Sequence, residues 1–171
     1  MRAFVRLAVY LLSAFSGALL SAWPAVEAAE FDTLVPMRSV GTATYYVGGY
    51  MEGVGDVDFM VDTGSGYVTI NEETLAALKK ENRARYVRKL RGVMADGSEL
   101  TVPVYRIETL SIGGLCHLND VEAAVFPGKT RQILGLSALK KAAPFIFSFD
   151  PPNLVLSNCP APTSVAATKD S

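Results

Sequence analysis

Short apolar segments separated by glycine-bearing turns are the feature that most restricts the fold of this chain. β-Branched and aromatic residues fill 44–51 (TYYVGGYM) and 57–61 (VDFMV), and the run EGVGD between them has the composition of a turn. Similar segments recur along the sequence, at 67–70, 101–107, 110–112 and 120–126. Strands at intervals of about ten residues predict an all-β domain, either a sandwich or a barrel.

Turn and capping signals refine this prediction. Asp96-Gly97 lies between apolar segments at 93–100, which is a strong signal for a β-hairpin. A final hairpin is expected from 145–149 and 154–156. Asn71 precedes Glu72 and Glu73 as an N-cap would, so a short helix is expected there, and one or two helical turns at 136–141. Residues 30–40 are expected to form a leading arm.

Composition limits the classes of function. The 171 residues, half of them hydrophobic, suit one globular domain. The formal net charge of −1 argues against general nucleic-acid binding, which needs a basic surface. Two cysteines and one histidine exclude a zinc ribbon or a Cys/His finger, and we expect neither a metal nor a cofactor. The lone His117 is interpreted as a surface or structurally satisfied residue.

Residues 1–28 have the pattern of a secretory signal. Arg2 and Arg6 precede an apolar stretch, and Val26-Glu27-Ala28 places small residues for cleavage after Ala28. The alternative is an uncleaved anchor, because residues 7–26 are long enough to span a bilayer and would associate the chain with a membrane. Either interpretation exports the domain expected at 29–159, and the polar residues 160–171 are expected to be a disordered tail.

Export leaves two alternatives open for the cysteines. Cys116 and Cys159 could form a disulfide in an oxidising compartment, or each could be a separate buried thiol. The basic run 79–91 likewise has two interpretations, a solvated face or a surface for an anionic partner or membrane.

The segment with the clearest chemical signal is Phe59-Met60-Val61-Asp62-Thr63-Gly64-Ser65. A carboxylate directly follows an apolar strand, and the small residues after it allow backbone amides to approach that carboxylate. A reactive acid can be held rigidly in this way while it stays accessible. Asp-Thr-Gly alone also occurs in ordinary turns, so further features are needed to interpret it.

Two further features resemble those of the retropepsin-like aspartic proteases, and more closely the exported bacterial single-domain type. The apolar pair Ile133-Leu134 and Gly135 lie about 70 residues downstream, before a short helix, and the Asp96-Gly97 hairpin lies between the two motifs. The resemblance covers about 44–157. It implies a closed single-lobe acid-protease barrel with one or two short helices, located in the periplasm or anchored to the inner membrane facing it.

The resemblance also implies residue roles. Asp62 would be the acid/base, Thr63 would hydrogen-bond across a catalytic dyad, and Gly64 would permit close approach. Ser65 would donate to the outer oxygen of Asp62, and Ile133, Leu134 and Gly135 would support the loop. The flap hairpin, here residues 93–99, would close on an extended polypeptide substrate through Ala95, Asp96, Gly97 and Ser98.

Aspartic proteolysis uses two carboxylates about 3 Å apart that share one proton. The chain contains one Asp-Thr-Gly, so the second carboxylate must come from another copy, and a homodimer is predicted. The alternative from another class is a catalytically inactive module of the same fold that binds extended peptides or serves assembly. A third possibility is an unrelated small β-barrel in which the Asp62 loop is an ordinary turn.

Overall fold

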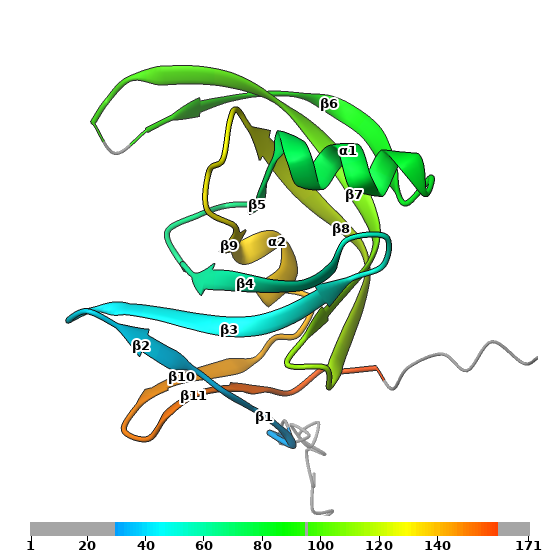
Figure 1. Cartoon of the computed structure of the whole chain (residues 1–171). Helices are drawn as coiled ribbons and strands as arrows, with labels where there is room; N and C mark the ends of the chain where they lie inside the picture. Colours follow the sequence, from blue (N-terminus) through cyan, green and yellow to red (C-terminus); the bar gives the residue numbers. More distant parts are fainter. Residues whose placement is uncertain (1–29, 95, 161–171) are drawn as a thin grey trace, which may run out of the picture.

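A computed structural model describes residues 30–94 and 96–160 (Figure 1). The expected signal or anchor at 1–28, Ala95 of the flap hairpin, and the expected tail beyond Pro160 lie outside the described residues. The strands are β1 (Thr33–Pro36), β2 (Arg38–Val40), β3 (Thr44–Met51), β4 (Gly55–Val61), β5 (Val68–Asn71), β6 (Ala84–Val93), β7 (Glu99–Ile112), β8 (Cys116–Phe126), β9 (Ile133–Leu134), β10 (Phe145–Phe149) and β11 (Pro152–Leu156). The helices are α1 (Glu72–Lys80) and α2 (Leu136–Leu139).

The main sheet closes on itself. Its strand order is β2-β3-β4-β9-β5-β8-β7-β6, and β3 also pairs with β7 through Gly49 and Ile112. Strands β3, β4, β9, β5, β8 and β7 therefore form a ring around a core that includes Phe59, Ile70 and Leu110, all with no exposed surface. The expected all-β, retropepsin-like barrel with two short helices is confirmed.

Local sequence signals account for most of these elements. Gly53 and Gly55 have φ angles of 86° and 100° in the turn that ends β3 and begins β4, a region that glycine enters without steric cost. The Asn71 side chain accepts a hydrogen bond from the Thr74 amide at 2.9 Å, as expected of an N-cap. In the described part of the chain, neither helix has the length and apolar character needed to cross a bilayer.

A second sheet has the order β1-β11-β10 and packs at one end of the barrel (Figure 1). The hairpin of β10 and β11 agrees with the expectation for 145–156. The expectation of a leading arm at 30–40 is corrected by the structure. This segment contains β1, which pairs with β11, and β2, which pairs with β3. Val35 is buried to 1% exposure by this pairing, and its partner Leu154 is more than a hundred positions away, so no local pattern marks the strand.

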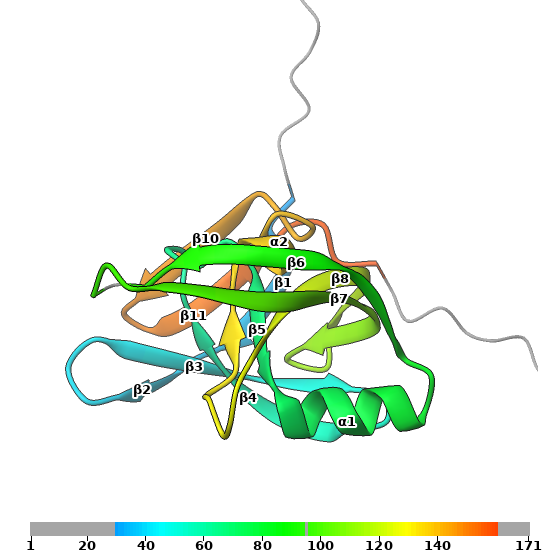
Figure 2. The ribbon, with the colours of Figure 1, turned by 90° about the horizontal axis from the view of Figure 1, so that it is seen from above.

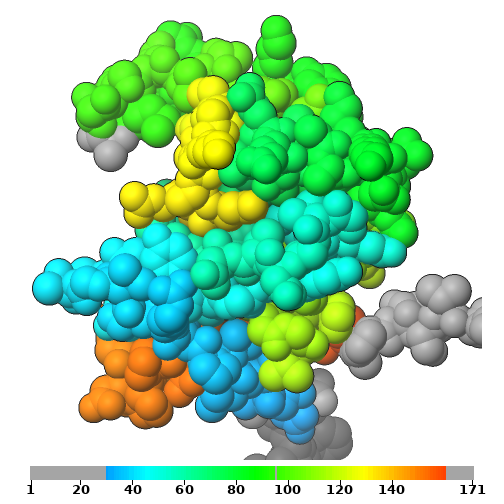
Figure 3. All heavy atoms as spheres, viewed as in Figure 1, coloured from blue at the N-terminus to red at the C-terminus, as the bar shows by residue number. Residues whose placement is uncertain are grey.

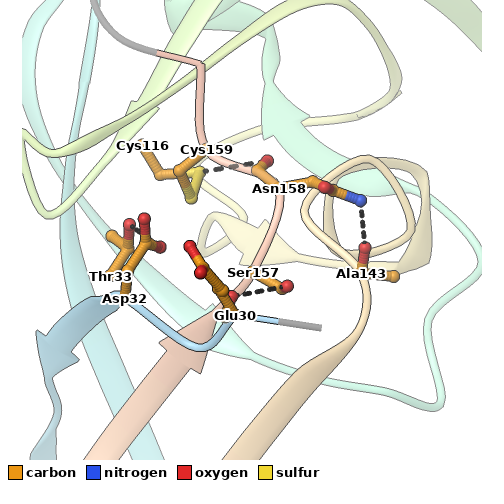
Figure 4. Close-up of a disulfide and its surroundings, with 8 residues drawn as sticks. All are labelled: Glu30, Asp32, Thr33, Cys116, Ala143, Ser157, Asn158 and Cys159. Atoms are coloured by element: carbon orange, nitrogen blue, oxygen red, sulfur yellow. Dashed lines mark hydrogen bonds between the residues drawn. A yellow bond between two sulfur atoms is a disulfide. The ribbon is translucent and has the colours of Figure 1, made fainter. Parts of the chain in front are cut away.

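A disulfide joins the segment after β11 to the barrel. Cys116 at the start of β8 is bonded to Cys159, with a Cα–Cα distance of 4.6 Å (Figure 4). Beside it, the Ser157 hydroxyl donates to the Glu30 carbonyl at 2.7 Å, and the Asn158 side-chain amide donates to the Ala143 carbonyl. Of the two alternatives for the cysteines, the structure has the bonded one.

The disulfide should make a large contribution to stability. Because it closes a loop with a sequence separation of 43, replacing both cysteines by alanine should lower the free energy of unfolding by about 4 kcal/mol. Urea denaturation at fixed protein concentration measures this. Dithiothreitol should destabilise the wild type similarly and leave the double variant unchanged. Equal stability of the wild type with and without the reductant would contradict the prediction.

Candidate active site

Asp62 stands where β4 ends, on the loop that leads to β5. Its backbone amide donates to the Leu134 carbonyl at 3.1 Å, and Met60 of the same strand donates to the Gln132 carbonyl at 3.0 Å. These bonds belong to the parallel pairing of β4 with β9. The position of the carboxylate is therefore fixed by a neighbouring strand that lies 70 residues further along the chain.

The loop after Asp62 turns back onto its carboxylate. The Gly64 amide donates to Asp62 Oδ1 at 2.8 Å, and the Ser65 amide donates to the Asp62 carbonyl at 3.3 Å. A Cβ on Gly64 would lie 3.1 Å from Asp62 Oδ1, so a side chain there would crowd the carboxylate. Asp62 itself is partly buried, whereas Thr63 and Gly64 are exposed.

The expected contact of Ser65 with Asp62 is not formed. The Ser65 hydroxyl donates instead to the Tyr67 carbonyl at 2.8 Å. A hydroxyl carries one proton, so it cannot also donate to the carboxylate. Ser65 therefore shapes the loop between β4 and β5, and the Gly64 amide is the donor that the carboxylate receives from this loop.

Strand β9 lies between β4 and β5 and holds their connecting loop. Ile133 pairs with Met60 on one side and with Thr69 on the other. The Leu136 amide beyond it donates to the Ser65 carbonyl at 2.8 Å. A Cβ on Gly135 would lie 2.1 Å from the Tyr67 carbonyl oxygen, so the backbones touch here and only glycine fits. The structural role expected for residues 133–135 agrees with this geometry.

The first turn of α2 adds a contact that the sequence analysis missed. The Ser137 hydroxyl accepts a hydrogen bond from the Val68 amide at 2.8 Å and donates to the Glu122 carbonyl at 2.6 Å. It thereby links β5 to β8 beside the Asp62 loop. The available signal was a single hydroxyl in the apolar run 134–139 (LGLSAL), two residues after the supporting glycine.

A second missed feature connects the flap arm to the site. Arg88 on β6 donates to the Tyr67 hydroxyl at 2.8 Å and to both carboxylate oxygens of Glu122, at 2.7 and 3.2 Å. The Arg88 guanidinium holds the pKa of Glu122 below its usual value, and Glu122 together with Tyr67 raises the pKa of Arg88. The run 79–91 contains seven cations, and nothing in the sequence distinguishes this one.

The flap hairpin is a two-stranded arm built from β6 and β7. Met94 donates to the Ser98 carbonyl at 2.8 Å, and Gly97 has a φ of 82° in the turn. Asp96 Oδ1 accepts from the Ser98 amide and hydroxyl at 2.9 and 2.6 Å, and these bonds lower the pKa of Asp96. The arm passes above β9 and extends beyond it (Figures 1 and 2).

The space beneath this arm is open. The space-filling view shows a recess between the flap hairpin and the segment around β9, drawn in yellow (Figure 3). The basic run 79–91 gives the arm a solvated, ion-paired face, because Arg83, Arg85, Arg88 and Arg91 each contact a carboxylate. β9, which borders the recess, pairs with the β4 residues that lead to Asp62.

Three residues considered from the sequence lie outside this arrangement. Cys116 and its partner Cys159 are at the barrel end described above, and His117 is partly buried on β8 opposite Ser111. Among the described residues, no three His, Cys, Asp or Glu side chains cluster as ligands of a metal ion. The chemistry available at the site is that of one accessible carboxylate in a glycine-rich loop.

The contact at Gly135 provides a stability test. Gly135→Ala should lower the free energy of unfolding by about 3 kcal/mol or more, because its Cβ would overlap the Tyr67 carbonyl. Gly66→Ala is the matched control, since a Cβ there meets nothing within 4 Å, and it should change stability by less than about 0.5 kcal/mol. Chemical denaturation measures both. Equal effects of the two variants would refute the proposed contact.

The Arg88–Glu122 pair predicts a pH dependence. The folded-state pKa of Glu122 lies below the unfolded value of 4.5. The ionised Glu122 therefore makes its full contribution to the free energy of unfolding above about pH 5, and this contribution is lost as the pH falls through the folded-state pKa. Compared with Glu122→Gln, the wild type should be more stable near pH 7, and this difference should shrink below about pH 4.5. Denaturation between about pH 7 and pH 3 measures it. A constant difference would contradict the assignment.

Comparison with known proteins agrees with this geometry. A solved structure, that of a retropepsin-like aspartic protease from Rickettsia conorii, superimposes with a TM-score of 0.52 at 19% sequence identity. The match covers 72% of this chain and 88% of that chain. At this identity the likeness shows a shared fold. No curated protein matched the sequence.

The family comparison covers the site itself. The model described as "gag-polyprotein putative aspartyl protease" matches residues 47–141, more than half of the chain. This range runs from β3 to the residues just after α2, and it includes Asp62, the flap hairpin and the β9 motif. The chain therefore belongs to the family described as "gag-polyprotein putative aspartyl protease", and its fold is retropepsin-like.

Proposed function

We propose that this protein is an exported aspartic endopeptidase that works as a homodimer, with one Asp62 from each subunit. The observation that carries the proposal is the Asp62 loop. Its carboxylate is held by the Gly64 amide and by the β4–β9 pairing, while Thr63 and Gly64 remain exposed. The proposal is supported by the family match across this loop.

The need for a second subunit follows from the chemistry. One carboxylate must accept a proton from the attacking water, while a protonated partner donates to the scissile carbonyl. Two such groups at close distance cannot both ionise easily, so the pair shares a proton and titrates in two steps. The chain has one Asp-Thr-Gly, and a two-fold axis near the exposed Thr63 and Gly64 would bring two copies of Asp62 together.

Substrate binding would use the recess beneath the flap hairpin. An extended polypeptide lying between this arm and the β9 segment can hydrogen-bond to main-chain groups as an added strand does. The flap turn exposes Val93 and Met94 at 72% and 39%, which gives it apolar surface to close over a peptide. The substrate class is therefore a polypeptide in an extended conformation.

The location we propose is the periplasm, either free or anchored at the inner membrane. The proposal rests on the signal pattern of residues 1–28, which lie outside the described residues. The Cys116–Cys159 bond is consistent with it, because structural disulfides persist in oxidising compartments.

The acid role of Asp62 can be tested on a mixed peptide library between about pH 3 and pH 7. Asp62→Asn should reduce cleavage by at least about a thousandfold, because the amide cannot transfer the proton. Asp56→Asn, on the same strand and exposed, should cleave as the wild type does. Absence of cleavage by the folded wild type would favour the inactive peptide-binding module instead.

The shared dyad makes a separate prediction. In equal mixtures of wild-type and Asp62→Asn chains that exchange subunits, only about one quarter of the dimers contain two intact carboxylates, so activity should fall to about a quarter of the wild type. Specific activity should also fall on dilution as the dimer dissociates. Activity of about one half in the mixture, independent of concentration, would show that single chains are active.

A further inference from the structure

Arg131 differs from the other arginines in the described ranges. Arg38, Arg83, Arg85, Arg88, Arg91 and Arg106 each lie within 4.0 Å of a carboxylate. Arg131 is exposed and has no such partner among the described residues. Among the arginines of the described ranges it is therefore the one whose guanidinium is left available to a ligand.

Arg131 lies next to β4, the strand that leads to Asp62. Arg131 Nη1 lies 3.7 Å from the sulfur of Met60, two residues before Asp62. Successive side chains on a strand point to opposite faces, and Phe59 is fully buried in the core. Met60 and the residue two positions on, Asp62, therefore belong to the other face, and the guanidinium lies over that face.

The segment that carries Arg131 is held by α1 and its cap. The Asn71 side-chain amide donates to the Thr130 carbonyl at 3.2 Å, and Gln132 donates to the Thr74 hydroxyl at 2.8 Å. The Gly128 amide donates to the Glu72 carboxylate at 3.0 Å, which gives that carboxylate a backbone partner. The residues on both sides of Arg131 are thus fixed, so little order has to be created when its side chain binds a ligand.

The surroundings favour a substrate group as the ligand. The yellow segment around β9 lies beside the recess beneath the flap hairpin, where an extended peptide would pass (Figure 3). Arginine presents a planar fork of donors that matches a carboxylate, and closing the flap over a peptide would exclude water from the pair. Lys129, two residues before Arg131, is also exposed and adds positive charge to the same segment.

From these observations we infer that Arg131 is a specificity-determining residue that binds an acidic side chain of the substrate close to the scissile bond. The inference rests on the proposed endopeptidase function. It predicts a preference for aspartate or glutamate at the substrate position that lies over Met60. The preference should weaken at high salt, because a partly exposed ion pair is screened.

The experiment uses the full chain and one cleaved peptide whose scissile bond has been located by mass spectrometry. A glutamine at each of four positions on either side of that bond is replaced singly by glutamate, and kcat/KM is measured for each pair. At one position glutamate should raise kcat/KM by about fivefold in the wild type. Arg131→Gln should bring this ratio close to one, and Arg131→Glu should favour lysine at that position.

Arg85→Gln is the matched control. Arg85 is an exposed arginine near the start of β6, eight residues before the flap hairpin, and it pairs with Asp120. The variant therefore removes the same charge outside the flap hairpin and should keep the wild-type ratio. Cleavage with no glutamate preference at any position, or with a preference that survives in Arg131→Gln, would overturn the inference alone. Absence of cleavage of every peptide would overturn the proposed function and this inference with it.

Discussion

The site depends on one contact between two backbones. Gly135 meets the Tyr67 carbonyl so closely that no side chain fits between them, and this contact places β9 between β4 and β5. With β9 inserted, the Asp62 amide has its acceptor, and the Ser65 carbonyl has its donor. Without β9, these polar groups of two partly buried residues would lose their hydrogen-bond partners. The loop can therefore be rigid around its carboxylate and still leave Thr63 and Gly64 exposed.

The same loop is joined to the flap by a charged network. Arg88 extends from the flap arm to the Tyr67 hydroxyl, and it is held by Glu122 on β8. Its strong hydrogen bonds keep Glu122 ionised at lower pH than a free carboxyl would be. The connection between the flap arm and the loop is therefore retained in mildly acidic solution. Ser137 completes the support with uncharged hydrogen bonds, which do not depend on pH.

Sequence reasoning worked best where the signal is local. The turn between β3 and β4, the Asn71 cap and the two hairpins each depend on neighbouring residues, and the structure has all of them. It failed where a partner is distant. No local pattern marks β1 as a strand, because its partner is the distant β11. The acceptor of the Ser65 hydroxyl is the Tyr67 carbonyl and not Asp62, because it depends on the path of the loop. Arg88 could not be recognised within a run of similar cations.

The sequence by itself determined the all-β class and the family, and it singled out Asp62 as the candidate acid, because strand periodicity and the motifs at 62–65 and 133–135 lie in consecutive residues. Only the tertiary structure decided which groups surround that acid. Closure of the barrel brings together segments about 20 to 70 positions apart, as the Arg88–Tyr67 and Met60–Arg131 contacts show. Hydrogen bonds and ion pairs across such separations follow from strand order and register, which no local pattern specifies.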